Sequence, residues 1–134
     1  MGSPTILAPE DGVSTATPAP WQELGLSDLP SALQTIPLCL VEFWAPDCLF
    51  NRLFAPRRAT LAKRYEGRIA LIRCKVSGAE PECAGWGIAG LPAFVLFRHG
   101  DRPRRWLGET HPSLVARAID AALSRGSVVD GRLP

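Results

Sequence analysis

The most informative segment of the sequence is residues 38–48, LCLVEFWAPDC. Residues 38–45 form an almost continuous apolar run that only Glu42 interrupts. Such a run predicts a strand that is buried on both faces of a sheet. After Cys48 an apolar pattern with helical spacing begins, and it continues to Tyr65. We therefore expect a buried strand, a short loop that ends in a cysteine, and a long helix in direct succession.

Strand and helix patterns alternate on both sides of this segment. Further strands are expected at residues 21–26, 69–76, 93–97 and 104–107. Short helices are expected after Ser27 and around residues 81–86, and a last helix begins at Thr110 or Pro112 and ends at Gly126. The order predicts an α/β fold in which a central mixed sheet of four to five strands is flanked by helices on both faces.

A single domain accounts for the 134 residues, of which 46% are hydrophobic and 21% charged. Residues 21–126 are expected to form this domain. Residues 1–20 are rich in proline, serine and threonine and predict a flexible N-terminal tail, and residues 127–134 predict a short C-terminal tail. The formal net charge of +2 provides no strong field for nucleic acid, so no nucleic-acid partner is expected.

Expectations about the location and the cofactors rest on sequence patterns for membrane helices, signal peptides and metal sites, which the sequence does not contain. No stretch approaches the ~20 apolar residues that a membrane-spanning helix needs, and the first residues do not form a signal-peptide pattern. We therefore expect a cytoplasmic monomer with reduced thiols and no membrane contact. No cysteine and histidine cluster has the spacing of a zinc site, so neither a metal nor another cofactor is expected.

Four motifs in register carry a resemblance to the thioredoxin family. They are residues 41–48, VEFWAPDC; Pro56, where the family kinks its long helix; residues 86–100, WGIAGLPAFVLFRHG; and Gly108 in the last strand. The resemblance covers roughly residues 21–124 and implies a thioredoxin fold. It also implies a cis peptide bond before Pro92 and a backbone at Leu91 that binds an extended substrate strand.

The chain departs from the family at its active site. Thioredoxins carry C-x-x-C, whereas residues 48–51 here are Cys-Leu-Phe-Asn. Cys48 keeps the position of the nucleophile, and Asn51 replaces the resolving cysteine. The start of a helix favours a thiolate and Asn51 can donate a hydrogen bond to the sulfur, whereas the carboxylate of Asp47 disfavours the thiolate. The balance between these effects stays open at this point.

Charged residues and further cysteines complete the expected site. Glu42 matches the buried acid of the family, which accepts a proton from the resolving thiol, and Arg73 matches a lysine that pairs with that acid. This implies either a retained proton relay or, favoured by the loss of the resolving thiol, a buried Glu42–Arg73 ion pair. Cys39 and Cys74 lie in apolar runs and are expected in the core. Cys83 is the one other candidate for a resolving thiol.

Two surfaces are candidates for binding a partner. The resemblance implies that an apolar peptide-binding groove is formed by Trp44, Leu49, Phe50, Leu91 and Pro92, although Phe50 also fits the core face of its helix. Two basic clusters consist of Arg102, Arg104 and Arg105 on the expected hairpin and of Arg52, Arg57 and Arg58 on the long helix. We expect these arginines to be solvated surface charges, the alternative being contact with an acidic protein partner.

Two functions from different classes remain open. In the first, Cys48 takes part in thiol–disulfide exchange by forming a mixed disulfide with a protein, peptide or small-thiol substrate, and an external thiol such as glutathione resolves it. In the second, the chain is a non-catalytic chaperone or adaptor that binds a peptide in the cis-proline groove. In its lost cysteine it resembles the phosducin-like proteins and the thioredoxin-like chaperones of hydrogenase maturation.

Overall fold

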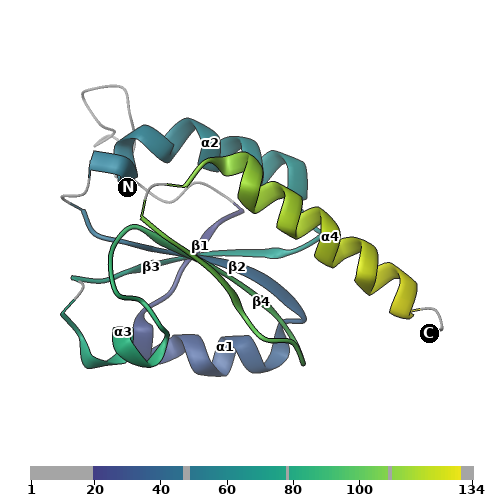
Figure 1. Cartoon of the computed structure of the whole chain (residues 1–134), viewed down its shortest axis with the longest axis horizontal. Coiled ribbons are helices and arrows are strands. Elements are labelled where there is room, and N and C mark those ends of the chain that lie inside the picture. Colours follow the sequence, from purple (N-terminus) through teal and green to yellow (C-terminus); the bar gives the residue numbers. More distant parts are fainter. Residues whose placement is uncertain (1–19, 47–48, 78, 109, 131–134) are drawn as a thin grey trace, which may run out of the picture.

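Five strands form a central sheet in the order β1-β3-β2-β4-β5 (Figure 1). The computed structural model describes residues 20–46, 49–77, 79–108 and 110–130, with side chains as far as Arg125. The strands are β1 (Gln22–Glu23), β2 (Leu38–Trp44), β3 (Ala70–Lys75), β4 (Ala93–Arg98) and β5 (Arg104–Leu107). β1, β3 and β2 run parallel, and β4 is antiparallel to both of its neighbours. The predicted mixed sheet is confirmed.

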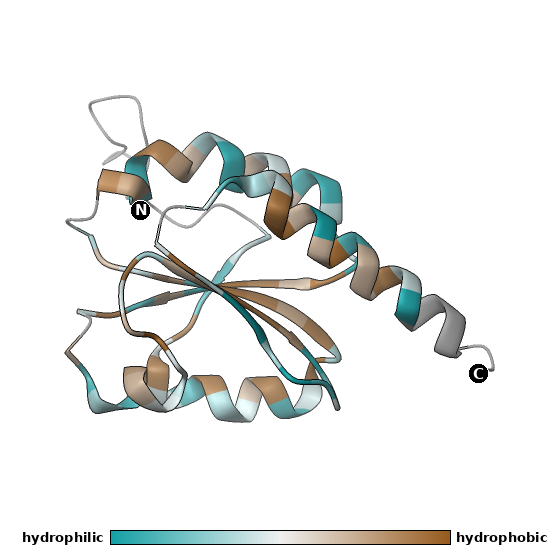
Figure 2. Cartoon of the chain, in the orientation of Figure 1, coloured by the Kyte–Doolittle hydropathy of each residue, from teal (hydrophilic) through white to brown (hydrophobic). Residues whose placement is uncertain are grey.

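Helices cover both faces of this sheet (Figure 1). One face carries α2 (Leu49–Tyr65) and α4 (Pro112–Asp130). The other carries α1 (Leu29–Thr35), which follows the short 3-10 helix η2 (Leu26–Asp28), and α3 (Pro81–Gly85). The central strands β2 and β4 are mostly apolar along their length (Figure 2), as expected for strands that are buried on both faces.

Alternate residues of β2 supply two separate cores. Leu38 and Leu40 pack with α2 and α4, whereas Cys39, Val41 and Phe43 pack on the face that carries α1 and α3. This division follows from the two-residue period of a strand. Glu42 has the same parity as Leu40, so its carboxylate lies among the apolar residues on the α2 side of the sheet.

The end of the last helix differs from the expectation. α4 continues through Gly126 to Asp130, so the predicted end of the last helix at Gly126 is wrong. The domain limits of 21–126 and the tail at residues 127–134 stay predictions. One glycine in a helix interior costs only about 1 kcal/mol relative to alanine, which the rest of a long helix can offset. The predicted first strand is also shortened, because β1 has two residues. Residues 1–19 and 131–134 lie outside the described residues.

Sheet register brings the loop after β2 beside the segment before β4. Phe43 pairs with Ala93, so Trp44 and Pro92 follow as neighbours at the same edge of the sheet. The Leu91–Pro92 peptide bond is cis, as the resemblance implies. Within the described ranges, no helix combines the length and the apolar character needed to cross a membrane.

Candidate functional site

The candidate site lies at the carboxyl end of β2, where α2 begins at Leu49. Trp44 and Pro92 are buried there and Leu91 is half-buried, whereas the Leu49 side chain is 66% exposed. Cys48 and its neighbour Asp47 lie outside the described residues. Cys48 directly precedes Leu49 in the chain, so the described residues of this edge border the predicted nucleophile.

Phe50 belongs to the core rather than to an open groove. Its ring stacks on Phe54 with the centroids 5.3 Å apart and meets the edge of Phe94 at 6.5 Å. It is partly buried against the cluster between the sheet and the α2–α4 layer. Of the two bulky residues that follow Cys48, Leu49 is therefore the one that presents an apolar surface.

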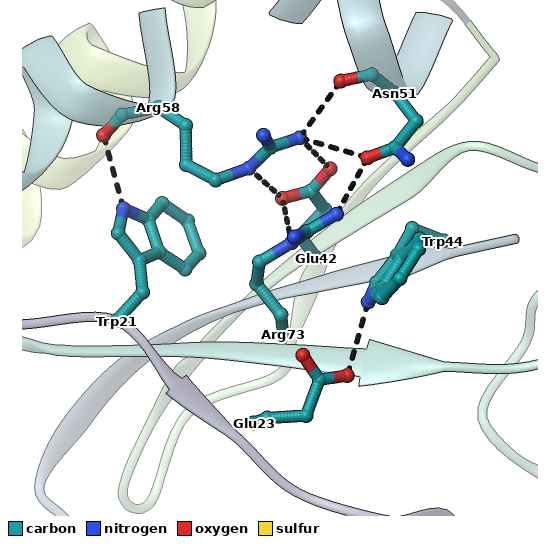
Figure 3. Close-up of polar contacts among 7 residues, drawn as sticks. All are labelled: Trp21, Glu23, Glu42, Trp44, Asn51, Arg58 and Arg73. Carbon is teal, nitrogen blue, oxygen red and sulfur yellow. Dashed lines mark hydrogen bonds and ion pairs between the residues drawn. The ribbon is translucent and has the colours of Figure 1, made fainter. Parts of the chain in front are cut away.

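A buried polar cluster lies beneath the first turns of α2 (Figure 3). Its members are Glu42 from β2, Arg73 from β3, and Asn51 and Arg58 from α2, each at most 1% exposed. The guanidinium of Arg58 donates to both Glu42 oxygens, from Nε to Oε1 and from Nη2 to Oε2, each at 2.7 Å. Arg73 Nε donates to Oε1 at 3.2 Å. The expected Glu42–Arg73 ion pair is present, and Arg58 extends it to a cluster of two cations around one anion.

The arrangement around Glu42 favours the structural interpretation over the proton relay. Both carboxylate oxygens already accept hydrogen bonds from guanidinium groups. Burial lowers the pKa of Arg73, and the nearby Glu42 carboxylate opposes this shift. Removing Glu42 would take the carboxylate away from two buried guanidinium groups, and breaking a buried ion pair in this way is strongly destabilising.

Asn51 is held by the same arginines. Its Oδ1 accepts from Arg73 Nη2 at 2.6 Å and from Arg58 Nη2 at 3.4 Å, and its backbone carbonyl accepts from Arg58 Nη2 at 3.4 Å. The Nδ2 group is buried and has no hydrogen-bond partner among the described residues. A buried donor without a partner costs about 1–3 kcal/mol, so this amide is suited to donate to an acceptor beside it. The hydrogen bond expected from Asn51 to the Cys48 sulfur stays a prediction.

The expectation that Arg58 is a solvated surface charge is wrong, because its side chain is 1% exposed. The sequence does contain a signal for its burial. Arg58 stands at helical spacing within the buried stripe of α2, which comprises Asn51, Phe54, Arg58, Leu61, Ala62 and Tyr65. A cation within such a stripe requires a buried partner, and Glu42 is a carboxylate within a buried strand. Arg52 and Arg57 are exposed, as predicted, and so are Arg102, Arg104 and Arg105.

Trp44 is fixed by polar contacts on the strands beside it (Figure 3). Its Nε1 donates to Glu23 on β1 at 3.2 Å, and the Arg73 guanidinium stacks 4.0 Å from the centre of its ring. Trp21 directly precedes β1. Its indole Nε1 donates a hydrogen bond to the backbone carbonyl of Arg58 at 3.0 Å, which connects the start of β1 to α2. The indole of Trp44 is 8% exposed and so forms a rigid wall of the site.

The described cysteines are free and buried on the face opposite α2. Cys39 and Cys74 are each 0% exposed, which confirms them as core residues, and this burial raises the pKa of both thiols to about 12. Burial and the carboxylate of Glu80 also raise the pKa of Cys83, whose Sγ donates to Glu80 Oε1 at 3.6 Å. Because the thiolate is the nucleophile, this environment disfavours Cys83 as a resolving thiol, and that role stays a prediction.

Among the described residues, two cavities border the site. One of about 740 Å³ is lined by Ala45, Pro46, Lys75, Val76, Ser77 and Glu80. The other, of about 330 Å³, is lined by Phe50, Leu53, Phe54, Arg57, Thr110, His111 and Pro112. In the described part of the chain, no three histidine, cysteine, aspartate or glutamate residues form a group that could hold a metal ion.

A thioredoxin family model matches residues 27–121. The chain belongs to the thioredoxin family. It is 32% identical over 85 residues to thioredoxin M5, chloroplastic, of Oryza sativa subsp. japonica, a match that covers 63% of this chain and 49% of that protein. It is 28% identical over 85 residues to a thioredoxin of Pyropia yezoensis, covering 63% of this chain and 79% of that one. The chain thus spans about half the length of the chloroplastic relatives it matches.

Solved thioredoxins share the fold of this family member. The reduced thioredoxin pre-protein of Schistosoma mansoni has a TM-score of 0.65 and 23% identity, covering 75% of this chain and 96% of that one. Oxidised mitochondrial thioredoxin 3 from Saccharomyces cerevisiae has a TM-score of 0.65 and 18% identity, covering 75% and 93%. At these identities the likeness shows the thioredoxin fold, with its mixed sheet between two helical layers.

Proposed function

We propose that this thioredoxin-family protein acts in thiol–disulfide exchange through a single reactive cysteine, Cys48. Its thiolate attacks one sulfur of a substrate disulfide, forms a mixed disulfide and releases the other sulfur as a thiolate that takes up a proton. A glutathione thiolate attacks the mixed disulfide and frees Cys48. This attack, at the substrate sulfur, leaves the substrate bonded to glutathione. A second glutathione thiolate attacks the glutathione sulfur of that disulfide and releases the second substrate thiolate, which takes up a proton, together with oxidised glutathione. The overall reaction converts one substrate disulfide and two glutathione molecules into two substrate thiols and oxidised glutathione.

This proposal rests mainly on the side chain at position 51, which is an asparagine that hydrogen-bonds to Arg73. A resolving cysteine would stand at this position, one helical turn after Cys48, and the side chain there is instead an amide that accepts a 2.6 Å hydrogen bond from Arg73. Cys83, the other candidate, is 1% exposed and packs with Cys39 and Cys74 on the far face of the sheet. An external thiol is therefore the source of turnover that fits the site.

The surroundings of Cys48 favour a protein or peptide disulfide as substrate. Leu49 offers an exposed apolar side chain, and the half-buried Leu91 stands before the cis bond to Pro92. An apolar residue beside the substrate disulfide would gain contact with Leu49. We further propose that the protein is a cytoplasmic monomer, since free thiols such as Cys39 and Cys74 suit a reducing compartment.

One observation favours the alternative, a non-catalytic chaperone or adaptor. Leu49 and Leu53, four residues apart on α2, are 66% and 55% exposed, and exposed apolar side chains at helical spacing suit a contact with a partner protein. In that case the thiol of Cys48 would contribute nothing to activity.

The test is a reduction assay with a glutathionylated peptide, with glutathione as the electron source. The wild-type protein and a Cys83→Ser variant are expected to accelerate the reaction to the same extent, and a Cys48→Ser variant is expected to lose the acceleration. Equal rates for Cys48→Ser and wild type, or no rate above that of glutathione alone, would rule out the proposal. A partner that binds Cys48→Ser as tightly as wild type would then support the adaptor.

A further inference from the structure

The side chain of Arg105 on β5 contacts the segment that leads from α3 to β4. Its Nε donates a hydrogen bond to the backbone carbonyl of Trp86 at 2.9 Å. Trp86 begins the loop of residues 86–92, which carries Leu91 and the cis bond to Pro92. Arg105 is an exposed residue, but its guanidinium is bonded to the backbone of the loop that borders the candidate site.

The end of α3 leaves the Trp86 carbonyl free to accept this bond. The N–H of Gly87 donates to the Ala84 carbonyl at 3.0 Å, and Gly87 adopts a left-handed conformation with a φ of 76°. A glycine in this conformation is common directly after a helix. Carbonyls at the end of a helix lack partners within it, and Arg105 supplies a donor for this one. The peptide unit between Trp86 and Gly87 is therefore hydrogen-bonded through both its carbonyl and its N–H.

Gly87 also provides the space that the guanidinium occupies. A Cβ atom at position 87 would lie 2.5 Å from Nε and 2.8 Å from Cζ of Arg105. Both distances are shorter than a Cβ atom tolerates, so a larger residue at this position would displace the guanidinium. The glycine therefore serves two purposes, the left-handed turn after α3 and the close approach of Arg105.

The other end of the loop is held by the same part of the chain. Gly108, which directly follows β5, donates its N–H to the Pro92 carbonyl at 2.8 Å. Arg105 and Gly108 are three residues apart, which corresponds to about 10 Å along an extended strand. Between the two attachment points, at Trp86 and Pro92, residues 89–90 are exposed. The loop is thus attached at both ends to β5 and the residue after it.

We propose that Arg105 is a positioning residue that fixes the loop of residues 86–92 for the binding of a peptide substrate and so favours peptide disulfides over small disulfides. The inference rests on the proposed function in one respect, that a peptide disulfide binds beside Leu91. A loop that is already ordered raises the affinity for an extended peptide, because binding then does not have to order it. A small disulfide has no peptide backbone to lie along the loop, so its reaction does not depend on Arg105.

The experiment compares a peptide disulfide with a small disulfide in the full chain. The two probes are the symmetric disulfide of a nine-residue peptide with one cysteine and bis(2-hydroxyethyl) disulfide. The rate at which each forms a mixed disulfide with the reduced protein is measured by acid quenching and intact-mass analysis over a range of probe concentrations. Arg105→Met removes the donor and keeps an unbranched side chain. It is expected to raise the half-saturating concentration of the peptide about 2- to 10-fold, the range that one hydrogen bond supports, and to leave the rate with the small disulfide unchanged.

Two further variants separate the hydrogen bond from the charge. Arg104→Met is the matched control, because Arg104 is an exposed neighbour on the opposite face of β5, with its guanidinium 5.4 Å from the centre of the Trp106 ring. It is expected to react with both probes as the wild type does. Arg105→Lys keeps the positive charge but has a methylene group in place of Nε. It is expected to resemble Arg105→Met.

Hydrogen exchange reports the attachment of the loop without any reaction of a thiol. The Gly87 N–H belongs to the peptide unit that Arg105 holds, and the next N–H, that of Ile88, donates to the Cys83 carbonyl at 2.9 Å. In Arg105→Met the amides of Gly87 and Ile88 are expected to exchange about 2- to 10-fold faster, again the range of one hydrogen bond. The amides of the central strand β2 are expected to keep their wild-type exchange rates.

Several results would overturn the inference. They are a wild-type half-saturating concentration of the peptide in Arg105→Met or in Arg105→Lys, equal losses with the two disulfides, and unchanged exchange at Gly87 and Ile88 in Arg105→Met. A wild-type protein that forms no mixed disulfide with either probe would refute the proposed function, and with it the preference for peptides. Hydrogen exchange would in that case still show whether Arg105 holds the loop, so the two failures are distinguishable.

Discussion

At the residue scale, Glu42 balances the two buried arginines. Its carboxylate accepts three hydrogen bonds from Arg58 and Arg73, and these side chains have no access to water. A Glu42→Ala variant would leave two guanidinium groups facing each other without an anion. We expect the free energy of unfolding to fall by about 3–5 kcal/mol, the range for breaking a buried pair, as measured by urea denaturation.

The control for this prediction is the exposed ion pair between Arg64 and Asp120. Its side chains are 55% and 44% exposed, with a separation of 2.9 Å between Nη2 and Oδ2. Arg64→Ala is expected to lower the free energy of unfolding by no more than about 1 kcal/mol. A Glu42→Ala variant as stable as Arg64→Ala would contradict the role given to the cluster.

Asn51→Cys tests whether the missing resolving thiol alone limits the site. A cysteine there stands three residues after Cys48, as in C-x-x-C, and is expected to give a dithiol that reduces insulin with dithiothreitol as the electron source. Asn51→Ser is the matched control, because it also removes the hydrogen bond to Arg73 but adds no thiol. Equal insulin reduction by the two variants would show that the site has diverged beyond this one residue.

Most residues of the cluster could be found from the sequence, and Arg58 could not without a model of the fold. Glu42 interrupts an apolar run, and the resemblance pairs Arg73 with it. Arg58 follows Arg57 in a helix with several basic residues and so looks like a surface charge. The position of Arg58 in the buried stripe of α2 predicts its burial only when the carboxylate of Glu42 on β2 is known to lie on the same side of the sheet.

At the scale of elements, the buried and the exposed face of α2 are expected to contribute very different amounts to the free energy of unfolding. Phe54 is 1% exposed, and its ring centre lies 4.9 Å from that of Phe94 on β4. Its neighbour Leu53 is 55% exposed. Phe54→Ala is expected to lower the free energy of unfolding by about 3–5 kcal/mol and Leu53→Ala by about 0.5 kcal/mol or less, both measured in urea. Similar losses for the two variants would mean that α2 packs through another face.

Local patterns predicted the strands well and the limits of the helices less well. β2 and β4 stand out as apolar runs, and the structure places them near the predicted residues, at Leu38–Trp44 and Ala93–Arg98. The apolar residues of α2 include both Leu53 and Phe54, but residues 53 and 54 point about 100° apart on a helix, and Phe54 is the one that packs in the core. Glycine signalled the end of α4 at residue 126, whereas the helix continues to Asp130.

At the scale of the whole molecule, the buried thiols link stability to pH. The pKa of Cys39 and of Cys74 is raised to about 12 in the folded protein, whereas a thiol in the unfolded chain ionises near 8.5. Above that pH the unfolded state binds fewer protons than the native state, so the free energy of unfolding falls as the pH rises. Each thiol contributes a slope of about 1.4 kcal/mol per pH unit once the unfolded chain is ionised.

Urea denaturation between pH 8 and pH 10 measures this slope. Burial and Asp120 raise the pKa of Tyr65 to about 12, whereas an unfolded tyrosine ionises near 10, so Tyr65 adds to the slope above about pH 9. Because the wild type and the variant both contain Tyr65, the difference between their slopes reports the two thiols. A variant with Cys39→Ala and Cys74→Ala is less stable at every pH but is expected to show a flatter slope. An unchanged slope in that variant would assign the pH dependence to other groups.

The fold brings residues that are far apart in the sequence together on one face of the sheet, beneath α2. The parallel register pairs Glu42 with Arg73, and α2 returns Asn51 and Arg58 to the same place (Figure 3). The result is a thioredoxin-family site that keeps its buried acid and cis bond and carries an amide at the resolving position. We propose that Cys48 reacts there without an intramolecular partner.

Incubation of the reduced protein with oxidised glutathione, followed by intact-mass analysis and peptide mapping, tests this claim most directly. We predict one glutathione per chain, attached to Cys48, which reduced glutathione then removes to restore the free thiol. The Cys48→Ser variant is expected to take up none. A disulfide between Cys48 and Cys83, or a Cys48 that stays unmodified while the protein is folded, would contradict the account.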